Sequence, residues 1–254
     1  MKIRLLVVKR TMTQVIWVDS RMLTSGTDSD FEVSLRESVH LSDARVRVDK
    51  LTFSDSFYTT DAGANLYFAA PNNSFSYVTV PQGAYTGFSL AAAIQAATGR
   101  DTIYSALTNS ITHILQSADR PWLSDAAIAA RTRSYPAGAN PSDPRSLNDV
   151  LGEGIISGST VTWSFGRMAP YTVLYLRSNR LRCENHHGPR GTHDILCSVP
   201  LTQGIGSQSS SPTGVYYNLA GGSSCRTMDF RLTDWVGRAV NLRGRSLSFQ
   251  LIFA

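Results

Sequence analysis

The sequence predicts an all-β protein, a single jelly-roll β-sandwich with a short helix near 87–98 and a helical or irregular insertion near 117–154. Three observations predict it: short segments that alternate apolar and polar residues, polar turn sequences between them, and few stretches of helical periodicity. With 254 residues, of which 42% are hydrophobic, the chain is long and apolar enough for one large core. We expect residues 1–20 to form an N-terminal arm or first strand, and residues 21–254 to form the jelly-roll domain.

The N-terminal part of the chain holds the first expected strands. Phe31–Leu35 alternates apolar and polar side chains, and Val46–Phe53 does the same with one break near Lys50. A period of two indicates strands with one face on a core and the other on solvent or a partner. The expected strands of this part are 15–18, 31–35, 46–53 and 75–80.

One amphipathic helix is expected over 87–98. Its alanines favour a helix, and Leu90 and Ile94 lie four residues apart on one apolar stripe. Either Thr86 or Ser89 has the hydroxyl side chain that caps a helix N-terminus.

Strands resume after the insertion, which is rich in Ala, Pro, Gly and Ser and carries two short helical patterns. The last strand, 247–253, is so apolar that it should lie inside a sheet or under a neighbouring subunit, because free apolar edges aggregate. The remaining expected elements are helices over 124–130 and 146–151 and strands over 161–163, 172–176, 194–199 and 228–232.

The formal net charge of +5 comes almost entirely from arginine, since the chain has only three lysines. Arginine suits phosphate and carboxylate recognition, but no run of basic residues marks a nucleic-acid track, and charges spread thinly over the surface explain the composition equally well. Three widely spaced cysteines predict small buried thiols in a reducing compartment rather than a disulfide framework. We expect no secretory signal and no membrane span.

No motif for catalysis is present. The chain has no Gly-x-x-x-x-Gly-Lys-Ser/Thr loop and no Gly-x-Ser-x-Gly elbow, and its four glutamates suggest no carboxylate pair. We therefore expect a non-enzymatic protein without a cofactor. We interpret the acidic residues Asp28, Asp30 and Asp61 as turn formers. Calcium binding is the alternative.

Zinc-type ligands cluster in one stretch of the chain. Cys183, His186, His187, His193 and Cys197 lie within fifteen residues. The stretch between them contains a Gly-Pro-Arg-Gly sequence, which is typical of a loop between two strands. We interpret it as a solvated loop flanked by core cysteines, with a metal site as the alternative. A jelly-roll enzyme of the cupin type needs histidines and a glutamate converging inside the barrel, and these histidines cluster in a loop instead.

Three stretches together resemble penton-like single jelly-roll minor capsid proteins of polinton-type viruses, virophages and related double-stranded DNA viruses. They are the pair 29–35 and 45–53, then Val78–Tyr85 leading into the helix, and finally 230–253 with its terminal Leu-Ser-Phe-Gln-Leu-Ile-Phe strand. The resemblance covers most of residues 29–254, and its motifs are apolar alternation plus a Pro-x-Gly-x-Tyr turn. The segment 117–154 has no counterpart in it.

The resemblance implies a structural virion protein, made in the host cytoplasm or nucleus, that closes icosahedral vertices as a homopentamer. Its partners would be a double jelly-roll major capsid protein and a vertex spike or fibre. Arg4, Lys9 and Arg10 of the arm would then contact packaged nucleic acid non-specifically. Residues 183–193 and 203–214 are the loops expected to face solvent or a partner. Another single jelly-roll minor capsid protein, or a receptor-binding lectin-like module, is the alternative.

Overall fold

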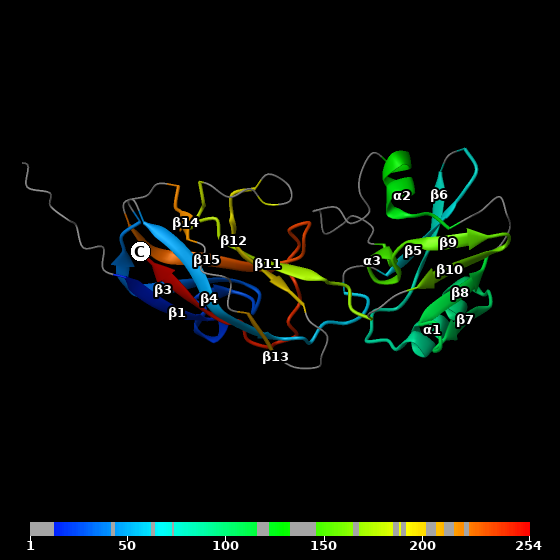
Figure 1. Ribbon diagram of the computed structural model, residues 1–254, viewed down its shortest axis with the longest axis horizontal. Coiled ribbons are helices and arrows are strands. Elements are labelled where there is room, and N and C mark those ends of the chain that lie inside the picture. Colours follow the sequence, from blue (N-terminus) through cyan, green and yellow to red (C-terminus); the bar gives the residue numbers. More distant parts are fainter. Residues whose placement is uncertain are drawn as a thin grey trace, which may run out of the picture.

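The structure, a computed structural model, describes residues 13–41, 44–61, 64–72, 74–115, 122–132, 146–164, 168–184, 188, 192–201, 207–210, 216–220 and 224–254. These residues form two lobes that lie end to end along the longest axis (Figure 1). We call them the sandwich lobe, which contains the first and last strands, and the distal lobe, which comes from the middle of the chain.

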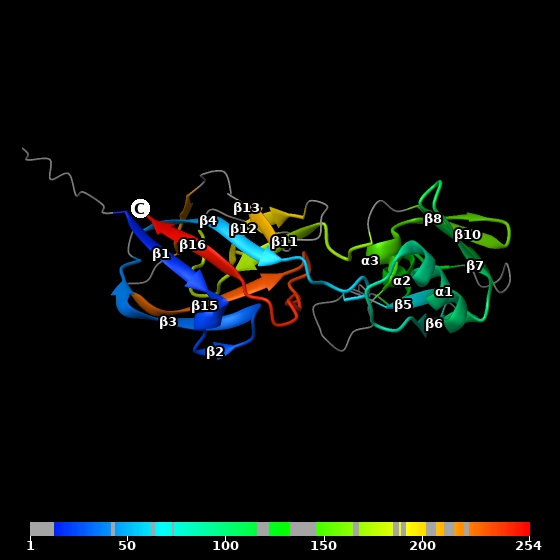
Figure 2. The same ribbon diagram turned by 90° about the horizontal axis from the view of Figure 1, so that it is seen from below.

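The sandwich lobe consists of two antiparallel sheets (Figure 2). The strands of the first sheet are β1 (Gln14–Asp19), β4 (Arg45–Ser54), β13 (Ser207–Ser210), β14 (Tyr217–Asn218) and β16 (Ser248–Phe253). Those of the second are β2 (Ser25–Gly26), β3 (Asp30–Val39), β11 (Val173–Arg177), β12 (Ile195–Pro200) and β15 (Cys225–Thr233). A short 3-10 helix, η1 (Ser20–Met22), follows β1.

The order of these strands is that of a jelly roll. The first sheet runs β1–β16–β4–β13, with β14 also paired to β4, and the second runs β12–β11–β15–β3–β2. Lettering β1, β3, β4, β11, β12, β13 with β14, β15 and β16 from B to I gives the orders B-I-D-G and C-H-E-F. This is the double Greek-key arrangement of two packed four-stranded sheets, so the predicted fold class is confirmed.

Alternation along the strands fills the space between the two sheets. Phe31 on β3 and Phe230 on β15 are paired across their strands, with ring centroids 5.8 Å apart. The Phe230 ring also meets Phe249 of the opposite sheet edge-on, at 4.9 Å between centroids. All three side chains are at most 2% exposed, so aromatic contacts join the two sheets at the centre of the core.

The last strand lies inside a sheet, as its apolar sequence requires. β16 pairs with β1 on one side and β4 on the other. Gln14 is in register with Phe253, so the start of the described chain and the C-terminus lie at the same end of the sandwich. This end is remote from the distal lobe (Figure 1).

The distal lobe fills the connection between strands D and E. Its strands are β5 (Asn65–Ala69), β6 (Phe75–Thr79), β7 (Thr102–Ser105), β8 (Ser110–Ile114), β9 (Gly154–Ser157) and β10 (Thr160–Ser164). Its helices are α1 (Gly87–Thr98), α2 (Asp125–Thr132) and α3 (Asn148–Leu151). A sheet of order β7–β8–β10–β9 and a β5–β6 hairpin are the two strand systems of this lobe.

The predicted helix is confirmed at both ends. Thr86 accepts a hydrogen bond from the Ser89 backbone N–H, and the Ser89 side chain accepts one from Thr86 N–H, which makes a capping box. Gly99 ends the helix in the left-handed region, with φ of 67°. Leu90 and Ile94 are fully buried, so the expected apolar stripe faces the core.

The distal lobe has a hydrophobic core of its own. Trp163, Ile111 and Val161 of its sheet pack with helix α1, and none of them belongs to the core of the sandwich. The described residues of the expected insertion, 122–132 and 146–154, form α2, α3 and the start of β9 within this lobe. We propose that the whole lobe, rather than 117–154 alone, is the folding unit added to the jelly roll. No helix in the described residues is long and apolar enough to cross a membrane.

Candidate functional site

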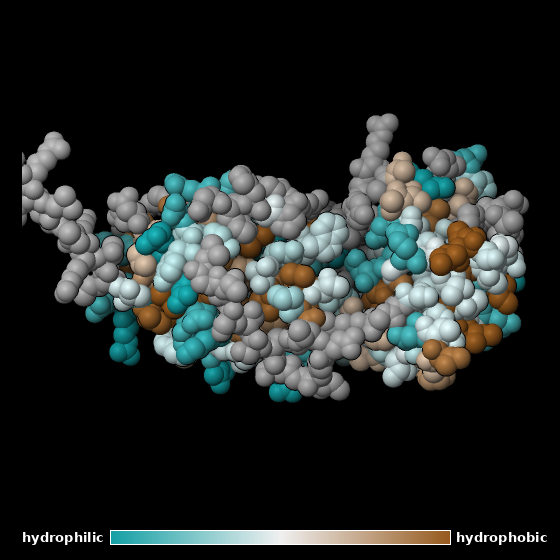
Figure 3. All heavy atoms as spheres, in the orientation of Figure 1, coloured by the Kyte–Doolittle hydropathy of each residue, from teal (hydrophilic) through white to brown (hydrophobic). Residues whose placement is uncertain are grey.

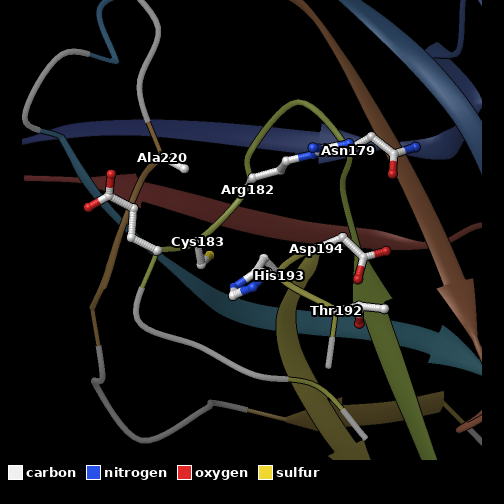
Figure 4. A pocket seen from close by; sticks show the side chains of 8 residues that line it. Asn179, Arg182, Cys183, Thr192, His193, Asp194 and Ala220 are labelled. Atoms are coloured by element: carbon white, nitrogen blue, oxygen red, sulfur yellow. The ribbon is translucent and has the colours of Figure 1, made fainter. Parts of the chain in front are cut away.

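The sandwich lobe contains a pocket of about 570 Å³. It lies beside the connection from β11 to β12 (Figure 4). The lining residues are Asn179, Arg182, Cys183, Glu184, Thr192, His193, Asp194 and Ala220. Both charge signs are therefore present, which suits binding of a polar partner.

Backbone pairing on both sides holds the pocket wall formed by residues 182–184. Cys183 N–H donates to the His193 carbonyl at 2.8 Å, and Glu184 N–H donates to the Asn218 carbonyl at 2.8 Å. Ala220 N–H in turn donates to the Arg182 carbonyl at 2.7 Å. The wall is thus a short extra strand segment rather than a free loop.

A buried ion-pair network lies behind the pocket. Arg177, only 4% exposed, contacts Asp194 at 2.9 Å and donates through Nε to the Thr233 hydroxyl at 2.8 Å. Arg231 approaches the second oxygen of Asp194 at 3.5 Å. Asp229 accepts backbone hydrogen bonds from Asn179 and Arg180, both at 2.9 Å. These contacts fix the turn after β11 and leave Asp194 already neutralised by arginine.

The two cysteines near the pocket are buried thiols. Cys183 lies next to His193 in the pocket (Figure 4), and its thiol is within 3.6 Å of the Leu181 carbonyl. Burial raises the pKa of Cys183 to about 11 and the pKa of Cys197 to about 12. Such thiols stay protonated near neutral pH, so neither is poised to act as a nucleophile.

The expected metal ligands fall into two groups. Cys183, His193 and Cys197 are described, whereas His186 and His187 lie outside the described residues. Among the described residues, no three His, Cys, Asp or Glu side chains converge as a metal site requires. The metal alternative therefore remains a prediction that depends on the two undescribed histidines.

The acidic turn residues each have another role. Asp28 accepts a hydrogen bond from Gly244 N–H at 2.7 Å, and Asp61 accepts one from Tyr58 N–H at 2.8 Å. Asp30 begins β3 and pairs in register with Arg231. They act as turn and strand residues here, and the described part of the chain does not gather them into one site.

The arm residues Arg4, Lys9 and Arg10 lie outside the described residues. The role predicted for them remains a prediction. Strand β1 begins at the end of the sandwich that is remote from the distal lobe (Figure 1).

No family model matches the sequence, and no curated protein matches it. The crystal structure of the selenomethionine-labelled mavirus penton protein aligns over 94% of this chain and 99% of that chain, with a TM-score of 0.49 and 11% sequence identity.

Sequence reasoning missed the arginine network behind the pocket. Arg177 follows the apolar strand 173–176, and nothing local shows that this arginine is buried rather than the first residue of a loop. Its partner Asp194 lies across the connection, so only the pairing of β11 with β12 brings the two together.

Proposed function

We propose that this chain is a non-enzymatic capsid protein that forms penton-like capsomers at icosahedral vertices. The observation that carries the proposal is the topology: a complete B-I-D-G and C-H-E-F sandwich with a second lobe inserted between strands D and E. Double-sheet jelly rolls serve mainly as viral capsid, lectin and cupin domains. The three stretches that resemble penton-like proteins fall on β3 and β4, on β6 with the start of α1, and on β15 with β16.

The mechanism proposed is assembly. Five copies around an axis would use two different surfaces of each chain, because a ring closes through a heterologous contact. The distal lobe lies at one end of the sandwich, and Gln14 and the C-terminus lie at the other. With the distal lobe outward, the arm with Arg4, Lys9 and Arg10 would point toward packaged nucleic acid. The major capsid protein would contact the sides of the ring, and a spike or fibre would bind the distal lobe.

Light scattering of the purified chain over a concentration series tests the proposal. We expect a species near five times the chain mass of 27.7 kDa. The series is repeated at high salt, which screens non-specific charge-driven association but leaves a packed ring largely intact. A chain that stays monomeric at every concentration, both alone and with a double jelly-roll major capsid protein, would refute the assembly role. A specific hit on a glycan array from such a monomer would support the lectin-like alternative.

A further inference from the structure

The outward face of the B-I-D-G sheet carries a cluster of positive charge. Arg45 and Arg47 lie two residues apart on β4, so their side chains share one face about 7 Å apart along the strand. Lys50 follows at an irregularity in the pairing with β16, with a positive φ of 48°. We call the surface formed by Arg45, Arg47, Lys50, Trp17 and Tyr216 the basic–aromatic face.

None of these three cations forms an ion pair with a carboxylate in the described part of the chain. The buried Nε of Arg47 has no hydrogen-bond partner there. Asp49 lies between them in sequence and faces the same side of β4. The buried Arg177 and Arg238, by contrast, do have carboxylate partners. Asp49 also shares a row with Gln250 and Trp17, so the face holds three cations against one carboxylate and keeps an excess of positive charge for an anionic ligand.

Aromatic rings accompany all three cations. Lys50 lies 5.6 Å from the centroid of the Trp17 ring, and Arg45 and Arg47 lie 5.6 and 5.2 Å from the centroid of Tyr216. Trp17 is 71% exposed, although tryptophan is normally among the more buried residue types. A large ring is thus presented to solvent beside a cation.

The strand register sets the rows of residues on this surface. Val15, Ile252 and Arg47 form one row across β1, β16 and β4, and Trp17 is in register with Gln250 in the next row. Ile252, in the middle of its row, is only 8% exposed. The stem of Arg47 can cover such an apolar neighbour while the guanidinium stays at the surface.

We propose that the basic–aromatic face binds single-stranded nucleic acid. Phosphates would contact Arg45, Arg47 and Lys50, and an unpaired base would stack on Trp17. A base pair in a duplex does not offer its ring face, and the major groove admits a helix or a two-stranded ribbon rather than the face of a larger sheet. An acidic peptide would satisfy the cations but would leave the exposed tryptophan ring without a stacking partner.

This binding does not require ring assembly, and it uses residues other than the arm. A chain that binds nucleic acid but stays monomeric, both alone and with a double jelly-roll major capsid protein, would support this inference while refuting the capsomer proposal. A chain that forms pentamers but does not bind nucleic acid would support the capsomer proposal and refute this inference.

The test is fluorescence anisotropy with the full chain and a labelled oligo-dT of about twenty nucleotides. Three phosphate contacts predict a salt slope of about −2 in log K against log salt, since each single-strand contact contributes about −0.7. The variant with Arg45→Gln, Arg47→Gln and Lys50→Gln should lose at least tenfold in affinity at 50 mM salt. Its salt slope should fall in magnitude from about 2 to about zero. A variant with Arg36→Gln, Arg100→Gln and Arg245→Gln, which changes three exposed arginines elsewhere, should retain the affinity and slope of the parent.

Arg47 is half-buried, so its substitution also changes packing in the folded protein. A second variant therefore leaves Arg47 in place. Trp17→Ala with Lys50→Gln changes only exposed side chains and should lose about tenfold in affinity for oligo-dT. Equal losses of affinity in the Arg45, Arg47 and Lys50 variant and in the Arg36, Arg100 and Arg245 variant would overturn the proposal, because they would show a general charge effect. Equally tight binding of a duplex would also overturn it, and so would equal competition by polyglutamate, which would indicate an acidic peptide partner.

Discussion

Arg238 of the sandwich lobe reaches Asp149 of helix α3 in the distal lobe, with 3.5 Å between Nη2 and Oδ2. The same guanidinium is bound through Nε by Asp234, whose other oxygen accepts three backbone N–H groups of the turn 236–238. Arg243, in the same connection from β15 to β16, approaches Asp61 at 3.5 Å. Two arginines of the connection from β15 to β16 therefore contact carboxylates outside the two sandwich sheets. Arg238 contacts Asp149 in helix α3, and Arg243 contacts Asp61 in the segment that follows β4.

Removing Arg238 should destabilise the protein. The side chain is 6% exposed and Asp234 is 4% exposed, so Arg238→Gln leaves a buried carboxylate without its counter-charge. Breaking such a pair from one side costs about 3 to 5 kcal/mol. Urea denaturation measures the change, with the exposed Arg245→Gln as the control that should stay within about 0.5 kcal/mol of the parent. Equal stability of Arg238→Gln and Arg245→Gln would contradict a stabilising role for the ion pairs of Arg238.

Asp149→Asn should alter the pH dependence of stability. Burial raises the pKa of Asp149 from 3.8 to about 6, with Arg238 opposing the rise and Asp125 and Asp234 adding to it. The folded state thus binds this proton more tightly than the unfolded state, so Asp149 contributes stability below about pH 4 that is lost as pH rises through 6. The contribution is about 2 to 3 kcal/mol. Relative to the parent, Asp149→Asn should therefore gain stability between pH 4 and pH 7, measured by urea titration at each pH.

His113 should act in the opposite direction over the same pH range. Burial lowers the pKa of His113 from 6.5 to about 4, and its Nδ1 lies 2.8 Å from the Thr102 hydroxyl. Here the unfolded state binds the proton more tightly, so stability is fully present above about pH 6.5 and falls as pH drops toward 4. His113→Gln should abolish about 3 kcal/mol of this acid sensitivity. Because the two groups oppose each other, the parent should show a flatter profile than either variant, and a parent profile steeper than both would refute the assignment.

The sequence predicted the strands and the helix because local patterns determine them. Phe31–Leu35 and the stripe of Leu90 and Ile94 each show the period of their element within a few residues. The position of the last strand inside a sheet was also predictable, since so apolar a strand would aggregate at a free edge. Which strands become neighbours was not visible, because the pairing of β16 with both β1 and β4 joins segments far apart in the chain.

The extent of the distal lobe escaped sequence analysis for a related reason. The strands 75–79 and 160–164 alternate like those of the sandwich, and nothing local shows that they face a different core. The pocket residues were partly identified, since Cys183 and His193 belong to the five possible metal ligands that the sequence analysis named. The arrangement of the side chains around them was not predicted. The burial that raises the pKa of the Cys183 thiol depends on segments that come together only in the fold.

The two cores should open separately in hydrogen exchange. Ile111 is fully buried in the distal core and Leu174 is fully buried in the sandwich core. Truncation of either to alanine should cost about 2 to 5 kcal/mol locally. Ile111→Ala should speed exchange in β7, β8 and β10 while leaving β3 and β15 as protected as in the parent, because neither of those strands contacts the distal core. Leu174→Ala is the matched variant and should give the reverse pattern. If Ile111→Ala loosened both lobes equally, the distal lobe would not be a folding unit of its own, and the jelly roll with its insertion would open as one cooperative domain.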